Sequence, residues 1–136
     1  MPLVVPNTQE VEVLNNRLNT PLKIRLYGNN VTPTGLTTVA AFTEIAGGGY
    51  ANKPLTFANW TISSGDPSSA IYNATQEWIF TGIINAPGTI YGYYITRDSD
   101  NALMLAERFN SALVPFSPVA GSVVRILPKY SAQSLF

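Results

Sequence analysis

The chain contains neither histidine nor cysteine among its 136 residues. Histidine is the side chain whose ordinary pKa suits proton transfer near neutral pH, and a cysteine thiolate is a common nucleophile and soft metal ligand. The composition therefore excludes imidazole and thiolate chemistry, and it excludes disulfide bonds as well. A few carboxylates, a glycine triplet and a set of aromatic side chains remain as candidates.

Two pairs of carboxylates are the candidates for metal binding and hydrolysis. Asp98 and Asp100 alternate beside Asn101, which suits calcium, but the glycine and glutamate that complete an EF-hand loop are missing. Glu77 and Glu107 form a glycosidase pair only if the fold brings them together. We expect a hydrogen-bonded turn at the aspartates and exposed or ion-paired glutamates. We therefore predict no metal site, no cofactor, no catalytic residue and no enzymatic activity.

The triplet Gly47-Gly48-Gly49 has the composition of a phosphate-binding loop but not its context. Such a loop is followed by a lysine and opens a helix, and neither signal is present here. The triplet instead predicts a flexible loop or a strained turn before Tyr50.

Aromatic residues form the last candidate site. Strand alternation predicts that Tyr91 and Tyr93 share one face and that Tyr94 lies on the other. One face must be core, and the other must be covered by the helix, by a loop or by another subunit. With Trp60 and Trp78 these rings could instead form a carbohydrate-binding platform. We single out Tyr93 as a residue that contacts a partner.

One helix is predicted near the start of the chain. Asn7 is a suitable cap, Glu10 completes a capping box, and Pro21 limits the helix at its other end. The apolar residues fall on one face at helical spacing, and they are Val11, Leu14 and Leu18.

The rest of the chain predicts strands and turns. The region 31–49 is a long loop, and we expect Phe42 and Ile45 to anchor it over the core. Pro128 predicts the end of the last strand or an edge position. Strands are expected at 22–27, 55–57 with 60–63, 70–73, 75–81, 89–97, 102–109 and 122–127, with a hairpin turn at 98–101. The fold class is all-β, a β-sandwich resembling a jelly roll, with one short N-terminal helix.

The length predicts a single β-sandwich domain over 7–136, preceded by an extended arm at 1–6. The arm is apolar between two prolines that favour an extended chain, and a disordered terminus is the alternative. Its predicted partner-binding residues are Pro2, Leu3, Val4, Val5 and Pro6. The formal net charge is zero, so we expect no nucleic-acid partner, and no apolar run is long enough to predict a membrane span.

Several segments resemble a family of small virion structural proteins from tailed bacteriophages. They are 6–14, 26–33, 42–44, 49–50, 59–60, 91–94 and 106–109, and together they span most of the chain. The resemblance implies a capsid decoration or cement protein on the virion surface, made in the host cytoplasm. It also implies the major capsid protein as partner and self-association as a homotrimer. A tail, baseplate or fibre-associated role is the alternative, and a carbohydrate-binding module is a second one.

Overall fold

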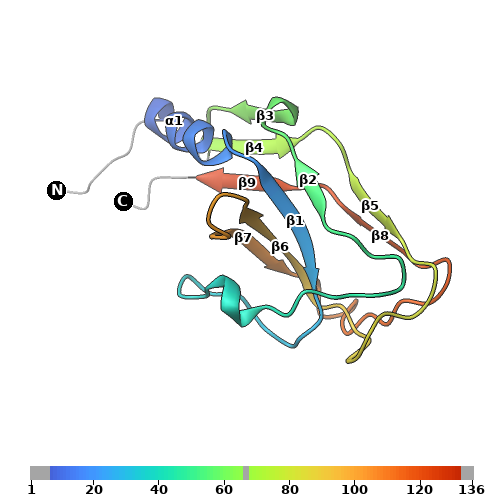
Figure 1. Ribbon diagram of the computed structural model, residues 1–136. Coiled ribbons are helices and arrows are strands. Elements are labelled where there is room, and N and C mark those ends of the chain that lie inside the picture. Colours follow the sequence, from blue (N-terminus) through green and yellow to red (C-terminus); the bar gives the residue numbers. More distant parts are fainter. Residues whose placement is uncertain (1–6, 66–67, 133–136) are drawn as a thin grey trace.

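The computed structural model describes residues 7–65 and 68–132 (Figure 1). This part of the chain is mostly β, with three antiparallel sheets and one short α-helix. The helix is α1 (Asn7–Leu18), and two 3-10 turns are η1 (Val39–Ala41) and η2 (Phe57–Asn59). The strands are β1 (Leu22–Tyr27), β2 (Lys53–Leu55), β3 (Trp60–Ser63), β4 (Ser68–Tyr72), β5 (Gln76–Ile79), β6 (Gly92–Arg97), β7 (Leu103–Arg108), β8 (Val123–Ile126) and β9 (Lys129–Ala132).

The strands pair in the orders β2-β1-β6-β7, β3-β4-β9 and β5-β8. The second and third sheets are joined along the chain, because β4 leads into β5 and β8 leads into β9 (Figure 1). At this junction the backbone N–H of Tyr72 donates to the carbonyl of Pro128 at 3.0 Å. One long surface therefore crosses both sheets.

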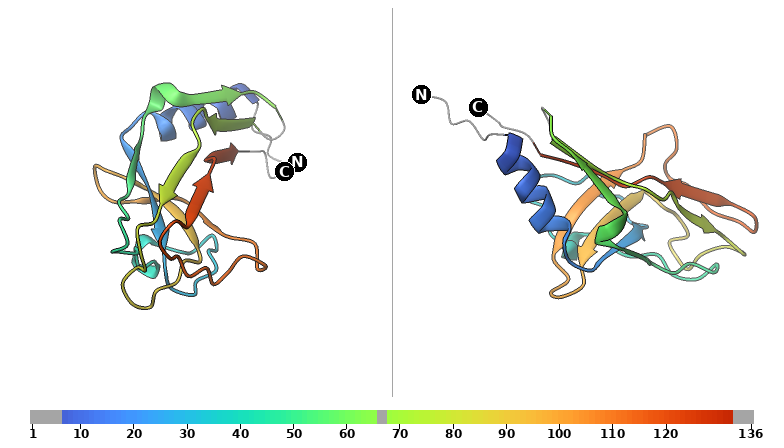
Figure 2. Two further views of the ribbon diagram at one scale, coloured as in Figure 1. Left: turned by 90° about the vertical axis from the view of Figure 1, so that its right-hand side faces the viewer. Right: turned by 90° about the horizontal axis from the view of Figure 1, so that it is seen from above.

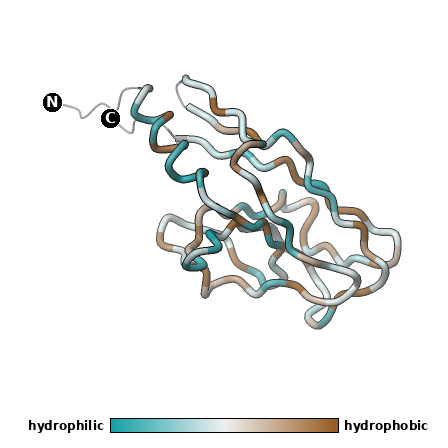
Figure 3. Tube along the Cα trace, turned by 45° about the horizontal axis from the view of Figure 1, so that its top comes forward, coloured by the Kyte–Doolittle hydropathy of each residue, from teal (hydrophilic) through white to brown (hydrophobic). Residues whose placement is uncertain are grey.

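The helix α1 has the predicted position. Leu14 and Leu18 are buried and Val11 is half-buried, so the predicted apolar face is confirmed. Most other helix residues are hydrophilic (Figure 3). This face packs on β3, β4 and β9, the strands beside α1 in Figure 2. A helix this short depends on such packing for its stability.

The core has two parts, on opposite faces of the β1–β6 sheet. Leu22, Ile24 and Leu26 alternate along β1 and enter the main cluster, which includes residues from all three sheets. On the other face Phe42 stacks on Tyr94 with ring centroids 4.8 Å apart. Phe42 and Ile45 are both 8% exposed, which confirms that they anchor the long loop.

Three predictions about the strands are wrong. Residues 55–57 and 60–63 do not form one bent strand, because η2 (Phe57–Asn59) intervenes and β2 and β3 lie in different sheets. Tyr91 does not share a face with Tyr93, because it packs in the same cluster as Tyr94. The strand begins only at Gly92, so its alternation does not extend back to Tyr91. In addition, the strand before Pro128 ends at Ile126, as predicted, but it is not the last strand, because β9 forms against β4 after Pro128. Proline lacks an N–H group, but its carbonyl still accepts a hydrogen bond, and Lys129 continues the strand.

The glycine triplet forms a tightly packed turn. All three residues have positive φ, and Gly48 has φ +62°. The Thr81 N–H donates to the carbonyl of Gly48 at 2.9 Å, and Tyr50 N–H donates to that of Gly47 at 3.1 Å. A Cβ atom on Gly48 would lie 2.7 Å from the carbonyl oxygen of Gly82. The turn predicted before Tyr50 is confirmed, and its backbone requires glycine.

Candidate partner-binding surface

Tyr93 lies in the core rather than on the surface. It is 4% exposed, and its ring centroid is 6.3 Å from that of Phe109. Burial and the nearby negative charge of Glu107 raise the pKa of Tyr93 to about 12. The ring is therefore not available to a partner in this structure. The other predicted contacts, Pro2, Leu3, Val4, Val5 and Pro6, lie outside the described residues.

The rings proposed for a carbohydrate platform are also packed inside. Trp60 and Trp78 are 7% and 4% exposed, and Tyr94 is 4% exposed. Trp78 donates its indole N–H to the carbonyl of Ala51 at 2.8 Å. Tyr91 is half-buried, with the guanidinium of Arg108 5.0 Å from its ring centroid. These contacts hold the aromatic side chains within the protein instead of arranging them as an open stacking surface.

The aspartates form the predicted hydrogen-bonded turn. Arg97 donates to both carboxylate oxygens of Asp100, at 2.9 and 2.6 Å, and the N–H of Ala102 adds a third bond at 3.2 Å. The Arg97 hydrogen bond is the main reason that the pKa of Asp100 is lowered to about 2. Asp98 lies 3.9 Å from the Lys23 ammonium. Residues 7–65 and 68–132 contain no group of three or more acidic, histidine or cysteine side chains that could hold a metal ion.

Glu77 and Glu107 lie in different sheets. Glu77 is on β5 and accepts a hydrogen bond from Arg125 at 2.5 Å across the β5–β8 pair. Glu107 is exposed on β7, opposite Tyr93 of β6. The predictions of an ion-paired and an exposed glutamate are confirmed.

A polar network that sequence reasoning missed ties the long loop to β1. Arg25 donates to one carboxylate oxygen of Glu44 at 2.7 Å, and the Tyr50 hydroxyl donates to the other at 2.6 Å. The N–H of Leu26 donates to the Tyr50 oxygen at 3.1 Å. Burial, and then the Glu44 hydrogen bond, raise the pKa of Tyr50 far above its usual value. With its charges and hydroxyl already engaged, the network serves to position the loop.

The outward face of β4, β5 and β8 carries aliphatic side chains where polar ones are usual. Ile79 and Val123 are directly opposite each other and are 60% and 37% exposed. Leu127 is 52% exposed and Ile71 39% exposed. Ile71 pairs with Lys129, so Leu127 is its diagonal neighbour on the same face. We call Ile71, Ile79, Val123 and Leu127 the outer aliphatic patch.

The patch is divided by the Glu77–Arg125 ion pair, which lies between its two halves. Apolar residues on both faces of 123–127 are the sequence signal that could have revealed it, because a strand with one wet face alternates strictly. Sequence could not show that Ile71 and Ile79 join this row, since that depends on long-range pairing.

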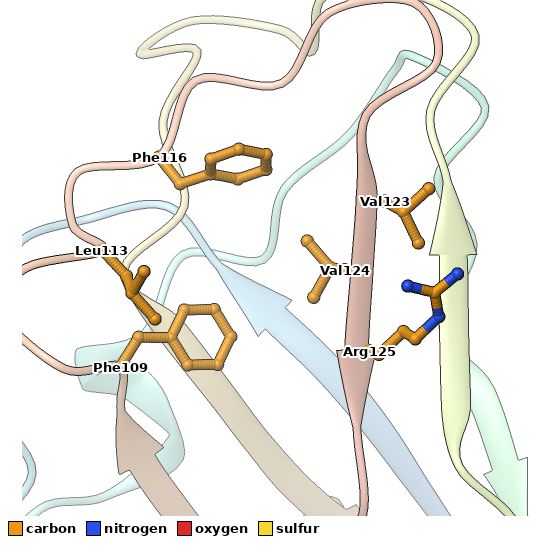
Figure 4. A pocket seen from close by; sticks show the side chains of 6 residues that line it. All are labelled: Phe109, Leu113, Phe116, Val123, Val124 and Arg125. Carbon is orange, nitrogen blue, oxygen red and sulfur yellow. The ribbon is translucent and has the colours of Figure 1, made fainter.

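An apolar pocket lies between the end of β7 and the start of β8 (Figure 4), and Val123 of the outer aliphatic patch is one of its lining residues. Its volume is about 250 Å³. Val124 points from β8 toward Phe109 and Phe116, whereas Val123 and Arg125 lie on the side of β5. Two hydrogen bonds between Phe116 and Ile90, at 2.7 and 3.1 Å, fix the position of the Phe116 backbone. Leu113 completes the lining and is 64% exposed.

None of the described helices is both long and apolar enough to span a membrane. Compared with protein-family models, with curated proteins and with solved structures, the chain finds no match in any of the three.

Proposed function

We propose that this chain is a capsid decoration protein of a tailed bacteriophage, which stabilises the head by bridging subunits of the major capsid protein. The observation that carries the proposal is the outer aliphatic patch, held on paired strands with exposed Ile79 and Leu127. Apolar surface buried against a partner contributes roughly 25 cal/mol per Å², and it requires no reactive group. The sequence resemblance supplies the capsid as the partner and a homotrimer as the assembly.

The proposal includes a β-sandwich for the whole fold. Its support is the main cluster, in which Ile24 and Ile95 of the four-stranded sheet pack with Tyr72, Trp78 and Val124 of the other two sheets. A two-layer arrangement gives one face to the core and leaves the other for a partner. The jelly-roll connectivity remains a prediction.

Weak individual contacts suffice for such a protein. A capsid repeats the same binding site many times, and a trimer engages several neighbours together, so modest contacts add up to stable attachment. The chain has zero formal net charge, which reduces the repulsion between crowded copies.

Binding to phage particles tests this proposal. Particles of the phage that encodes the protein, prepared without it, are mixed with the wild-type chain or with Ile79→Asp, Leu127→Asp or both. Leu36→Asp is the matched control, because Leu36 is 93% exposed and lies in the loop after β1, away from the patch. We expect at least about a tenfold loss of bound copies for the double variant and none for the control.

Two results would reject the proposal. Equal binding of the double variant and the wild type would show that the patch is not the attachment surface. Absence of the wild-type chain from the head would remove the capsid role. The tail or baseplate alternative predicts about a dozen copies at one vertex instead of on the order of hundreds over the head. The carbohydrate-binding alternative needs an exposed aromatic platform, and none of the aromatic side chains among the described residues is exposed.

A further inference from the structure

We propose that the apolar pocket between β7 and β8 receives residues Leu3–Val5 of a second copy of this chain, so that copies associate head to tail. The inference rests on the self-association included in the proposed function, and it names the two surfaces that meet. Val123 belongs both to this pocket and to the outer aliphatic patch, but Leu113, which the tests below change, lies outside the patch.

The pocket has the chemistry to hold aliphatic side chains. Its apolar lining is made by the rings of Phe109 and Phe116 with Leu113, Val123 and Val124. Leu113 is 64% exposed at the mouth, so an apolar occupant would cover a side chain that now meets water. The charged lining residue Arg125 is already paired with Glu77. The site therefore fits short aliphatic residues better than a charged group.

The pocket and the start of α1 lie at opposite ends of the molecule. The Ser68 hydroxyl, which donates to Glu10 of α1 at 2.9 Å, belongs to a residue that pairs with Ala132 at the end of β9. Val124 lies at the other end of the same β8–β9 run, eight residues earlier. Figure 1 shows this separation, with the start of α1 and the end of β9 on one side and the start of β8 on the other.

Chain length excludes insertion of a copy's own arm. Eight residues of extended strand cover about 26 Å at about 3.3 Å per residue. Leu3 stands four residues before Asn7, and four residues span at most about 14 Å. Residues 133–136 follow directly after Ala132, and four residues are likewise too short to reach the pocket from there. Only another molecule can place residues 3–5 in this pocket.

The segment is suited to dock as an extended strand. Leu3, Val4 and Val5 are three successive aliphatic residues between Pro2 and Pro6. The prolines restrict the free chain, so less conformational entropy is lost when it docks. In an extended chain Leu3 and Val5 point to one side and Val4 to the other, so two side chains can enter the pocket.

This contact joins two different surfaces, which makes the interface heterologous. A heterologous interface produces a closed ring when the rotation between copies closes, and an open fibre when it does not. A homotrimer of the proposed kind is the closed three-membered case.

Single cysteines test the contact directly, because the chain contains none of its own. One preparation carries Val4→Cys, which leaves Leu3 and Val5 free to dock, and the other carries Leu113→Cys. The two are mixed, oxidised under native conditions and analysed by non-reducing electrophoresis and mass spectrometry. Leu36→Cys replaces Leu113→Cys in the control, because Leu36 is 93% exposed and does not line the pocket.

We expect the mixed disulfide between positions 4 and 113 to form at least about tenfold faster than the one between positions 4 and 36. Equal rates would overturn the inference. A third preparation carries Phe136→Cys. If its disulfide with Leu113→Cys formed faster than that of Val4→Cys, the inference would also be overturned, because the occupant of the pocket would then be the other end of the chain.

A second measurement avoids the thiols. Leu113→Asp should reduce the molar mass measured by light scattering to that of one chain, with an unchanged circular dichroism spectrum, while Leu36→Asp should leave the wild-type mass. A monomeric wild type, or a Leu113→Asp variant that still associates, would overturn the inference. Because purified protein is used, these failures are distinct from a failure to bind phage particles.

Discussion

Glu10 is a carboxylate that the packing of α1 against β4 removes from solvent. It is 2% exposed, and the Ser68 hydroxyl, which is fully buried, donates to it at 2.9 Å. A buried acceptor that loses a donor costs about 1–3 kcal/mol. We expect Ser68→Ala to lower the free energy of unfolding in urea by that amount. Ser63→Ala, at an exposed position of β3, is the control and should change it little. Equal stabilities of the two variants would contradict this role of Ser68.

The buried tyrosines predict a loss of stability in alkali. Burial is the main cause that raises the pKa of Tyr93 and that of Tyr94 to about 12. Both pKa values lie above the value of about 10 in the unfolded chain, so the unfolded chain loses these protons first as the pH rises. The contribution of the two tyrosines to the free energy of unfolding is therefore complete below pH 10 and is lost as the pH rises through 12. At pH 11 the free energy of unfolding should be lower by about 1 kcal/mol for each tyrosine. Urea unfolding at pH 8 and pH 11 measures it.

The variant Tyr93→Phe/Tyr94→Phe removes both titrating hydroxyls and keeps the rings in the core. We expect its free energy of unfolding to fall less between pH 8 and pH 11 than that of the wild type. The same fall in both proteins would show that other groups cause the alkaline loss.

Single residues were predictable where local pattern decides their environment. Leu14, Leu18, Phe42 and Ile45 were placed correctly because periodicity or isolation among polar residues marks them as buried. Tyr93 was misjudged, because a strand buried on both faces offers no polar side in its sequence to mark the core face.

Among the elements, the turn formed by the glycine triplet 47–49 gives the most direct test of backbone conformation. Gly48 has φ +62° and packs against the carbonyl of Gly82, so an added methyl group is both strained and obstructed. We expect Gly48→Ala to lower the free energy of unfolding by at least about 1–2 kcal/mol. Gly35→Ala is the matched control, because a Cβ there meets nothing within 4 Å and its φ is not in the positive region. Thermal and urea unfolding would show whether the two variants differ.

Most elements were predictable because their signals are local. The helix follows from apolar spacing and a proline stop, and the β6–β7 hairpin follows from its turn residues, including Asn101 with φ 57°. The strand β9 was missed because its partner β4 is about sixty residues away along the chain and Pro128 suggests a stop. The outer aliphatic patch was missed for the same reason, since non-local pairing assembles it.

For the whole molecule, head-to-tail association should make thermal stability depend on concentration. Association that involves only folded chains stabilises them by mass action, so the Tm of the wild type should rise as the protein is concentrated. The Tm of Leu113→Asp should be constant over the same range, and that of Leu36→Asp should follow the wild type. Differential scanning calorimetry over a hundredfold range of concentration makes the comparison. A constant wild-type Tm would contradict it.

The contact of α1 with β4 and β9 determines when a newly made chain can finish folding. The helix leaves the ribosome before every strand that it packs on, and β9 is the last strand that the structure describes. Until β9 emerges, the nascent helix has only part of its platform, and its leucines stay exposed to solvent or to chaperones. Ribosome-stalled chains that end near residue 110 should therefore be digested by protease within α1, whereas chains in which residue 132 has cleared the exit tunnel should resist.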